Sequence, residues 1–429
     1  MNLFAWTFEC MQYILNSTAS DVFFSDTTVY ENMNRLVKLL SYRPKAYRSS
    51  QCEFSIAGEF ASSYSATLTI PRFTHLETGK NDSSGNPIIY AFTKDYTFTV
   101  RNGSVLTPAK KPILTNGQFY VYEFENASTG AKYESFDTSG INEKVDDSSM
   151  SIFMKWVDDN GEDNWEEVSI VDSLVLDASS TDLACEQTLL EDKEISIKFG
   201  DGVHGQIPPE GAMIYLVYLK SNGAGGKITA GDIKSSTLRC RIDGMTNTDD
   251  FLNMCFGGKD NFDSQYSLFK SSGTTVFSTS KLVLSNTEDS SDVEDYEDVD
   301  EIRANAPDSF RRGERLITAS DFKSFVLENF SPRIKDAYVC NNVDYCLNFF
   351  KWLDENGKLS PSIGLSGYSY SDANNFNNVY IWLLPNSRKL LDQDLEVVVQ
   401  KCDSRKFLGC NVIPCRRNKD LFLPMLGYN

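Results

Sequence analysis

Three glycine-rich turns lie close together in one short stretch and constrain the fold more than any other feature of the sequence. The first turn spans residues 200–205, the second ends at Gly211, and the third spans 223–226, with strand-like residues before and between them. Glycine reaches positive φ without steric penalty, although it loses much conformational freedom on folding. Such turns predict a compact antiparallel meander. We expect positive φ in at least one glycine of the first turn: Gly200, Gly202 or Gly205.

The wider middle of the chain also has the pattern of strands. Short runs rich in β-branched and aromatic residues are bounded there by Gly, Asn, Asp or Pro. The expected strands are 66–70, 96–100, 119–124, 151–157, 194–199 and 213–219. We therefore predict a mostly antiparallel β domain over residues 49–233.

Residues 1–48 have a helical pattern instead. Two apolar stripes recur at helical spacing and end before Pro44. The stripes consist of Phe4, Phe8, Met11 and Leu15, and of Val29, Met33, Leu36 and Leu40. Two short amphipathic helices without a domain of their own need a surface to cover. We predict that they pack mainly on other chains in a bundle, so these residues form the candidate partner-binding set.

Residues 234–300 are dominated by Ser, Thr, Asn and Asp, with one expected strand at 275–284. We predict a loop-rich insertion here that closes with an acidic run. A helix is expected at 299–305, stopped by Pro307.

The remainder, 301–429, is predicted to be a mixed domain. Thr318 and Asp321 form a helix-start signal before an apolar run. Beyond it we expect strands at 335–340 and 378–384, a helix at 392–401 and a strand at 410–414. The fold class is thus multidomain α+β, with N-terminal helices, a central mostly antiparallel β region and a small C-terminal β-β-α-β unit.

The charge balance is strongly acidic. The chain has 60 acidic and 41 basic residues, a formal net charge of −19, and nine acids without a base lie within residues 287–301. Nucleic acid and anionic lipid repel such a chain, so neither is expected as a main partner. We expect the acidic run to be exposed and its end to begin a helix, where negative charge is favourable. The other acids should be solvated or meet a basic partner.

The apolar pattern predicts no membrane span. The longest uninterrupted apolar run, 213–219, has seven residues, whereas a spanning helix needs about 20. No Lys or Arg precedes Arg35, so the basic region of a signal peptide is missing. Ten scattered cysteines indicate free, buried thiols in a reducing compartment, and synthesis in a cytoplasm is expected.

No catalytic, cofactor or metal site emerges from the motifs. The two histidines, His75 and His204, lie in loop-like or turn-like sequence, and the cysteine spacings do not form zinc-type pairs. The glycine loops at 223–227 and 257–259 lack the residues of a phosphate loop. With sixty acids, no spacing singles out a carboxylate pair, so a carboxylate-dependent hydrolase is a less favoured alternative.

Three motifs in order carry a family resemblance. One is the pattern Phe-Gly-Asp-Gly-x-x-Gly-x-x-Pro-Pro-x-Gly, and a second consists of Ile-Arg-x-x-Ala-Pro followed by Arg-x-x-Thr-x-x-Asp. The matching residues are Phe199, Gly200, Asp201, Gly202, Gly205, Pro208, Pro209, Gly211, Ile302, Arg303, Ala306, Pro307, Arg315, Thr318 and Asp321. The third and weakest motif comes first in the chain: it extends from Val-Tyr-Glu-Asn at 29–32, in an expected helix, to Leu-Ser-Tyr-Arg-Pro at 40–44. Together they resemble baseplate J-like proteins, in particular the wedge proteins of T-even-type contractile-tailed phages.

Three features depart from the family pattern. Ser41 stands where the family has Gly, and about 40 residues separate Gly257-Gly258 from the Ile-Arg helix, which usually lies close to it. The sequence also ends soon after its last expected strand, so contacts that longer relatives make there are expected to be missing or different.

The resemblance implies a non-enzymatic structural protein of a phage tail baseplate. Its implied partners are other wedge proteins and a second copy of itself, and further hub or sheath-initiating proteins. The wedge ring would rearrange on host contact and trigger sheath contraction. The implied location is the virion tail baseplate, assembled in the bacterial cytoplasm. An alternative from another class is a β-rich tail adhesin that binds host surface glycans, supported by the aromatic content, although aromatic residues more often fill cores.

Overall fold

The fold was analysed in a computed structural model of the chain. It describes residues 11–12, 23–38, 42, 44–58, 60–106, 111–141, 144–158, 160–171, 173–190, 193–235, 237–273, 275–312, 315–330, 334–355, 357, 377–385, 392–403, 405–406 and 409–415. Four residues of the candidate partner-binding set, Phe4, Phe8, Leu15 and Leu40, lie outside these ranges. The chain divides into two compact units, Met1–Ala304 and Asn305–Asn429.

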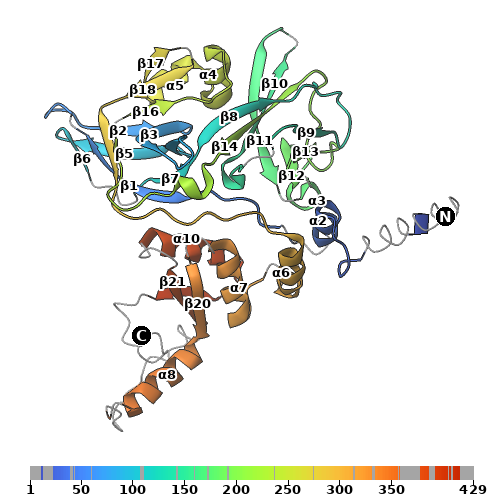
Figure 1. Cartoon of the computed structure of the whole chain (residues 1–429), viewed down its shortest axis with the longest axis vertical. Helices are drawn as coiled ribbons and strands as arrows, with labels where there is room; N and C mark the ends of the chain where they lie inside the picture. Colours follow the sequence, from blue (N-terminus) through green and yellow to red (C-terminus); the bar gives the residue numbers. More distant parts are fainter. Residues whose placement is uncertain are drawn as a thin grey trace, which may run out of the picture. The chain divides into compact units, whose positions relative to one another are not determined.

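The larger sheet of the first unit has nine strands in the order β15-β19-β1-β7-β4-β3-β16-β18-β17 (Figure 1). They are β1 (Gln51–Gly58), β3 (Thr74–Asn81), β4 (Pro87–Ala91), β7 (Ile113–Asn116), β15 (Lys234–Ser235), β16 (Leu238–Cys240), β17 (Lys270–Gly273), β18 (Val276–Thr279) and β19 (Leu282–Asn286). The consecutive pieces β15 and β16 pair with β19 and β18, and β16 also pairs with β3. The consecutive pieces β15 and β16 thus lie between β3 and the consecutive pieces β18 and β19. Because β19 pairs in turn with β1, the sheet closes as a barrel.

A bent ribbon extends two strands of this barrel. β2 (Ala66–Ile70) precedes β3, β5 (Tyr96–Arg101) follows β4, and both pairs are antiparallel. The ribbon bends at Phe73, which has a φ of 66° and donates its N–H to the carbonyl of Phe92 at 2.9 Å. A short strand, β6 (Ser104–Val105), adds to β5. The apolar faces of β2 and β5 pack into the same core as the barrel strands.

The second sheet of this unit has seven strands in the order β8-β14-β10-β11-β12-β13-β9. They are β8 (Gln118–Glu123), β9 (Ser135–Asp137), β10 (Ser151–Val157), β11 (Asp163–Val171), β12 (Ala184–Leu189), β13 (Ile195–Phe199) and β14 (Met213–Lys220). Only β11 and β12 pair in parallel. The sheet has a core of its own. The six strands expected from the sequence are confirmed in position: four of them belong to this sheet, and the other two are β2 and β5.

Short helices complete the first unit. They are α2 (Tyr30–Lys38), α3 (Leu174–Asp177), α4 (Thr248–Phe256) and α5 (Lys259–Gln265), with 3-10 turns at Asp147–Ser149 and Gly223–Gly226. The side chain of Asn247 caps α4 by accepting the N–H of Asp249, and Gly257 ends the helix with a φ of 69°. The Gly-Gly element of the family resemblance is therefore a helix-ending turn between α4 and α5.

The segment 234–300 is not the loop-rich insertion that we expected. It supplies five strands of the closed barrel, β15 to β19, and both α4 and α5. Polar composition was a poor guide because short barrel strands bury only alternate residues, as β18 and β19 do. The expected strand at 275–284 exists, but it is divided into β18 and β19 at Ser280–Lys281 and extends to Asn286.

The second unit contains a three-stranded sheet, with β20 (Ile334–Asn341) antiparallel and β22 (Asn411–Cys415) parallel to the central β21 (Asn378–Pro385). Its helices are α7 (Ala319–Phe330), α8 (Asn342–Glu355) and α10 (Asp392–Asp403). α7 and α10 contribute to a core with the sheet. The expected β-β-α-β order is confirmed, and α8 is inserted after the first strand. The fold class is therefore multidomain α+β with a β-rich centre.

Helix α6 (Val299–Arg312) spans the boundary between the two units. It begins where the sequence indicated, but it continues through Pro307 instead of stopping there. An interior proline removes one backbone N–H and crowds the carbonyl four residues earlier, which opposes a helix. The burial of Ile302 and Ala306 on one face of α6 favours the helix in spite of this cost. The observed boundary differs from the four segments expected from the sequence, because residues 23–38, the β region and 234–300 share one compact unit.

Candidate interaction site around the glycine turn and the acidic strap

The glycine turn, residues 199–211, is organised by the carboxylate of Asp201. Its Oδ1 accepts the N–H groups of Val203 at 3.0 Å and His204 at 2.8 Å, and its Oδ2 accepts the hydroxyl of Tyr133 at 2.9 Å. These hydrogen bonds, led by that from His204, lower the pKa of the carboxyl well below its usual range. Asp201 is therefore ionised at neutral pH and closes the turn.

The glycines are required by space as well as by backbone angle. Gly202 and Gly205 have φ values of 85° and 84°, which confirms the expectation of positive φ. A Cβ on Gly200 would lie 2.2 Å from the carbonyl oxygen of His204, closer than any real contact. The turn thus closes onto Gly200, and no other residue fits that position without opening it.

The glycine turn is also where three loops meet. Tyr133 donates its N–H to the carbonyl of Gly200 at 3.0 Å, and Gly205 donates to Ser179 at 3.1 Å. Further along, Gly211 donates to Ser128 at 2.7 Å. The two prolines also take part, since the carbonyl of Pro208 accepts the hydroxyl of Ser128 at 3.5 Å and the carbonyl of Pro209 accepts the N–H of Ala212 at 3.1 Å. The motif residues therefore set the backbone of this end of the seven-stranded sheet.

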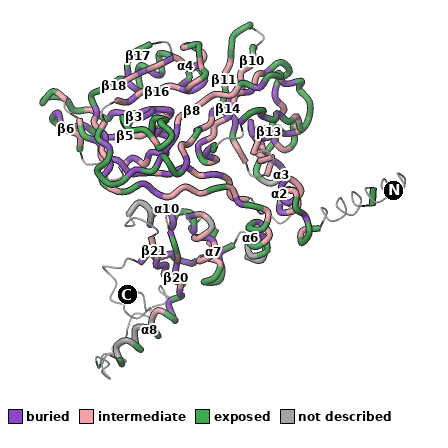
Figure 2. Tube along the Cα trace, viewed as in Figure 1, coloured by how far each residue is buried: buried purple, intermediate pink, exposed green. Residues whose placement is uncertain are grey.

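The acidic strap, residues 287–298, is not the exposed insertion expected from its charge. It continues the ladder of β19 and β1, because Ser291 donates to Gln51, Arg48 and Glu294 exchange backbone hydrogen bonds, and Glu297 donates to Lys45. Figure 2 shows the segment between β18 and α6 mainly in the colours of buried and intermediate residues. Charge alone was misleading, since the strap pairs through its backbone and leaves many carboxylates at the surface.

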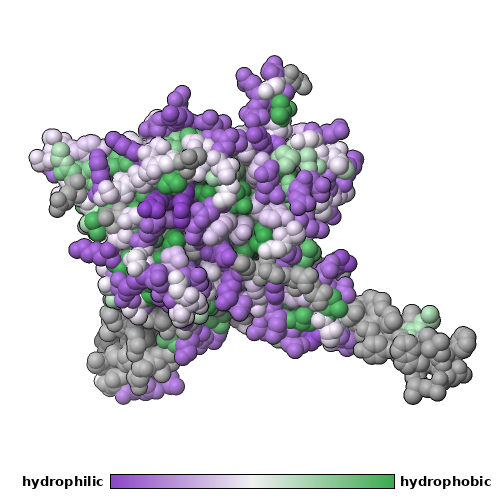
Figure 3. Space-filling model, turned by 45° about the horizontal axis from the view of Figure 1, so that its top comes forward, coloured by the Kyte–Doolittle hydropathy of each residue, from purple (hydrophilic) through white to green (hydrophobic). Residues whose placement is uncertain are grey.

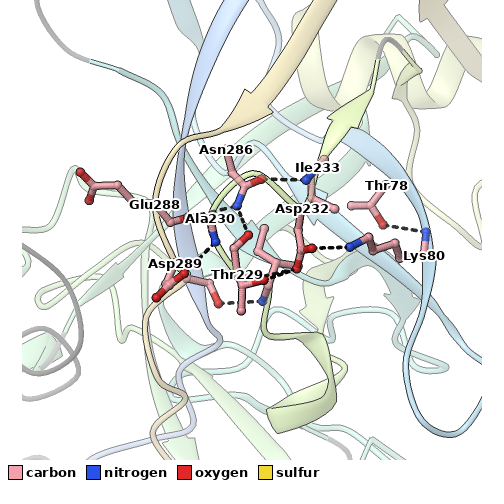
Figure 4. Close-up of polar contacts among 11 residues, drawn as sticks. Thr78, Lys80, Thr229, Ala230, Asp232, Ile233, Asn286, Glu288 and Asp289 are labelled. Carbon is pink, nitrogen blue, oxygen red and sulfur yellow. Dashed lines mark hydrogen bonds and ion pairs between the residues drawn. The ribbon is translucent and has the colours of Figure 1, made fainter.

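The strap is irregular at its start. Asn286 pairs with Phe54 and Glu294 with Arg48, so eight positions on the strap side correspond to six on the other, and two extra residues are accommodated between them. The side chain of Asn286 fills this irregularity (Figure 4): its Nδ2 donates to Thr229 O at 2.7 Å and Glu288 O at 3.0 Å, and its Oδ1 accepts the N–H of Ile233 at 2.8 Å.

A loop at 227–233 fastens this end of the strap (Figure 4). Asp289 accepts the N–H of Ala230 at 2.7 Å. Outside the view of that figure's labels, Lys227 forms an ion pair with Asp292. Asp232 bonds to Lys80 of β3 at 2.6 Å and to the hydroxyl and N–H of Thr229. These partners, led by Lys80, lower the pKa of the Asp232 carboxyl.

At the other end of the strap, Glu297 is a buried carboxylate. It is 3% exposed and accepts the hydroxyl of Tyr42 at 2.8 and 2.9 Å and the N–H of Lys45 at 2.9 Å. Tyr42 belongs to the first motif of the family resemblance and is itself 3% exposed. A buried carboxylate is tolerated when it is hydrogen-bonded, so this contact joins the N-terminal segment to the strap.

Helix α2 packs on its own chain, contrary to the expectation that its stripe binds other chains. Met33 is fully buried, and Asn34 donates to the carbonyl of Leu189 at 3.1 Å. The ammonium of Lys193 lies 4.8 Å from the ring of Tyr30 and 4.4 Å from that of Tyr296 in the strap. Amphipathic spacing predicts a buried face but does not say which chain buries it.

The other members of the stripes remain partly accessible. Val29 and Leu36 are intermediate in exposure, and Met11 is 64% exposed in its short described segment. Met33 is therefore not available to a partner, whereas partner binding by Met11, Val29 and Leu36 stays a prediction.

The Ile-Arg motif reaches back to the N-terminal segment. Arg303 donates from Nη2 to Thr27 O at 2.6 Å and from Nε to Phe24 O at 3.4 Å, and it pairs with Asp300. Thr27 is fully buried. The motif arginine thus holds the chain just before α2.

In the second unit, Thr318 and Asp321 form the expected helix start. Asp321 Oδ2 accepts the N–H of Thr318 at 2.7 Å, and Thr318 Oγ1 accepts the N–H of Asp321 at 3.2 Å. These reciprocal bonds satisfy N–H groups at the beginning of α7. Arg315, the remaining motif residue, is exposed.

Sequence reasoning missed Lys193 and Asn286, and it interpreted Glu297 as a favourable charge at a helix start and not as a buried carboxylate. None of them belongs to a motif, and each acts through residues distant in sequence. The uncharged break in the acidic run at Ser290-Ser291 was the one available signal of burial, since both serines are buried.

Two features of the described residues bear on chemistry: the grouping of possible metal ligands and a pocket near Cys255. No group of three or more His, Cys, Asp or Glu among them could hold a metal ion, and no helix among them is long and apolar enough to cross a membrane. A pocket of about 430 Å³ is lined by Arg72, Lys94, Asn261 and other residues around Cys255. Burial raises the pKa of the Cys255 thiol, which disfavours a thiolate nucleophile.

The surface does not single out one hydrophobic interface. Val157, Val175 and Val203 are about 60% exposed in three different elements. On the face drawn in Figure 3, hydrophobic side chains lie in separate groups among hydrophilic ones. Single exposed apolar residues are ordinary at protein surfaces, so these positions alone identify no partner.

Comparisons with known proteins give a weak likeness to solved structures. No protein-family model matches the chain, and no curated protein matches it. Among solved structures, the chain is similar to a component of the anti-feeding prophage baseplate, determined by cryo-electron microscopy with sixfold symmetry. The alignment has 12% sequence identity and a TM-score of 0.24, and it covers 96% of this chain and 67% of that one. A TM-score this low establishes neither a shared fold nor membership of a family.

Proposed function

We propose that this chain is a structural component of a contractile-tail baseplate, acting as a wedge protein beside other wedge proteins and a second copy of itself. The proposal rests on the order of the three motifs in the sequence and on what their residues do. In the described structure, motif residues shape backbone or join distant segments. None of the motif side chains surrounds the pocket near Cys255.

The observation that carries the proposal is the contact between Arg303 and the carbonyl of Thr27. It joins the Ile-Arg motif to the segment that precedes α2 and the Leu-Ser-Tyr-Arg-Pro motif. Glu297 makes a second connection, since it binds Tyr42 of that same motif. Motifs that are far apart in the chain thus support one local structure, which is expected of a protein whose function is to hold a shape.

The acidic strap fits a mechanical role. It runs from the closed barrel to α6, the helix that spans the two compact units. Its backbone bonds to residues 45–51 and its bonds to the 227–233 loop fix it along its length. A firmly held connection would let the first unit keep its geometry while a baseplate rearranges. The proposal includes no catalytic step and no cofactor.

The proposal is tested by locating the chain in tail particles from the phage or prophage that encodes it. An epitope-tagged chain should appear in purified tails, and gold-labelled antibody should mark the baseplate end of the tail. An Arg303→Ala variant should be incorporated less well, whereas Arg101→Ala, at an exposed position of β5, should be incorporated normally. Absence from the particles would refute the proposal. Label at fibre tips, together with glycan binding by the isolated chain, would favour an adhesin instead.

A further inference from the structure

The three-stranded sheet β2-β5-β6 ends in a strand whose outer edge is unpaired in the described part of the chain. β2 pairs with β5 over five consecutive positions, from Ala66 opposite Val100 to Ile70 opposite Tyr96, without a bulge. Among the described residues, β2 has no second partner strand. An open edge presents unpaired N–H and C=O groups and is a template for another strand.

Natural proteins usually protect such an edge with charge, proline or a bulge. β2 has none of these within it, and residues 62–71 contain no charged residue, although the chain as a whole has a net charge of −19. Pro71 comes only after the strand ends. A second copy of this acidic chain could therefore approach the edge of β2 without bringing two negatively charged side chains together.

One face of this ribbon is made of threonines. Thr67 lies opposite Thr99, and Thr69 lies opposite Thr97, with the two hydroxyl oxygens of the latter pair 3.2 Å apart. Thr67, Thr97 and Thr99 are exposed, whereas Leu68 on the other face is buried in the core. Cross-strand threonine pairs stabilise antiparallel strands, so this face already displays the pairing that an added strand would repeat.

The sequence of β2 is complementary to itself. In the segment Ala-Thr-Leu-Thr-Ile, the threonines lie symmetrically on either side of Leu68. An antiparallel copy centred on Leu68 would place each Thr67 opposite Thr69 of the second copy, and would place Leu68 opposite Leu68. A twofold axis would then make both halves of the contact the same, which is the arrangement of an isologous dimer.

We propose that the β2 edge is a self-association surface at which a second copy of this chain adds its own β2, giving a continuous sheet β5-β2-β2-β5. The inference rests on the strand edge and not on the proposed baseplate role. Five paired residues extend over about 17 Å, and such a contact is smaller than a stable protein interface. The dimer is therefore weak in solution and becomes significant where many copies are held close together.

The experiment measures self-association of the full chain by sedimentation velocity over a wide range of concentrations. Wild type should form a dimer at high concentration, and added salt should not weaken it because the contact is uncharged. The variant T67K/T69K places lysine opposite lysine at both symmetric positions, and its dissociation constant should rise by about tenfold or more.

Two further variants separate the strand edge from general effects. T97K/T99K adds the same charges on the same face but on β5, one strand away from the edge, and it should dimerise like wild type. Mixing T67K/T69K with T67E/T69E should restore a mixed dimer, because opposite charges then face each other. A monomeric wild type, equal weakening by the β2 and β5 variants, or failure of the mixture to dimerise would each overturn the proposal.

Discussion

Arg303 donates a hydrogen bond of 2.6 Å to the backbone carbonyl of Thr27, a residue 276 positions earlier in the chain. The acceptor lies just before α2, and the donor lies in α6. A hydrogen bond from a charged donor is shorter and stronger than one between neutral groups, and here its acceptor belongs to a fully buried residue. This one contact fixes the course of the N-terminal segment against the end of the acidic strap.

Replacing Arg303 should loosen that segment before anything else. Arg303→Ala removes the bond to a carbonyl of a fully buried residue, and we expect a loss of about 1–3 kcal/mol in the stability of the first unit. Amide exchange should accelerate in residues 24–38. Arg101→Ala is the matched control and should leave both measurements unchanged. Equal melting temperatures and equal exchange for the two variants would show that the contact is not important for stability.

The glycine turn should respond to substitution in a defined order. Gly200→Ala forces a Cβ to within 2.2 Å of a backbone oxygen, so the turn must open, and we expect a loss of about 2–4 kcal/mol. Gly202→Ala and Gly211→Ala have positive φ but meet nothing closer than 3.5 Å, and each should cost about 1–2 kcal/mol. Gly202→Val should cost about 1–2 kcal/mol as well or somewhat more, because a β-branched residue tolerates this region poorly.

Urea denaturation of the four glycine variants measures this order. Gly200 is the discriminating position, since its own φ is not positive and only the close approach of the turn requires glycine there. If Gly200→Ala were as stable as Gly211→Ala, the steric argument would be wrong.

Local features were predictable from the sequence where neighbouring residues determine them. The glycines of the glycine turn predicted positive φ, which the structure confirms. The helix start was predictable because Thr318 and Asp321, three residues apart, bond to each other's backbone N–H. The strands of the central region were visible through their β-branched and aromatic residues. In each case the chemistry that fixes the structure lies within a few positions.

Other features depend on residues that are distant in sequence, and the pattern did not reveal them. The strap looked solvated because it is acidic, yet its backbone pairs with residues 45–51 and its Glu297 is buried against Tyr42. Met33 looked like a partner contact because a helical stripe does not specify which surface it covers. Pro307 looked like a helix stop, although the burial of Ile302 and Ala306 supports a helix through it.

His75 should make the stability of the first unit depend on pH. Its side chain is 1% exposed, and its Nε2 accepts the N–H of Phe119 at 2.9 Å. Burial, assisted by the charge of Arg241, lowers the pKa of His75 to about 3, below the ordinary value of about 6.5 for an unfolded chain. The folded state therefore favours the neutral ring. Its stabilising effect is complete above the unfolded pKa and is lost as the pH falls from about 6.5 towards 3.

A variant without this titration isolates the effect. His75→Gln can still accept the N–H of Phe119, so it should lose some stability at neutral pH through altered packing but should be less sensitive to acid. Between pH 6 and pH 4 the wild type should lose up to about 1.4 kcal/mol per pH unit relative to the variant. Urea midpoints measured across this range give the difference. Parallel pH curves for the two proteins would rule out His75 as the source.

The acidic strap should behave as a structured part of the first unit and not as a free loop. The amides of Ser291, Glu294 and Glu297 each donate to the backbone of residues 45–51, so they should exchange slowly in the isolated chain.

Glu297→Ala leaves the Tyr42 hydroxyl and the Lys45 N–H without their acceptor in a buried place, and we expect a loss of about 2–4 kcal/mol. Asp298→Asn removes an exposed acid of the same strap but keeps a side-chain oxygen that can accept the N–H of Glu301 at the start of α6, so stability should change by less than about 0.5 kcal/mol. Hydrogen exchange across residues 42–51 and 287–298, compared between the two variants, decides the matter: faster exchange on both sides of the ladder in Glu297→Ala alone supports the strap as a fastened connection. Rapid exchange of the strap already in wild type would mean that its acids are solvated after all.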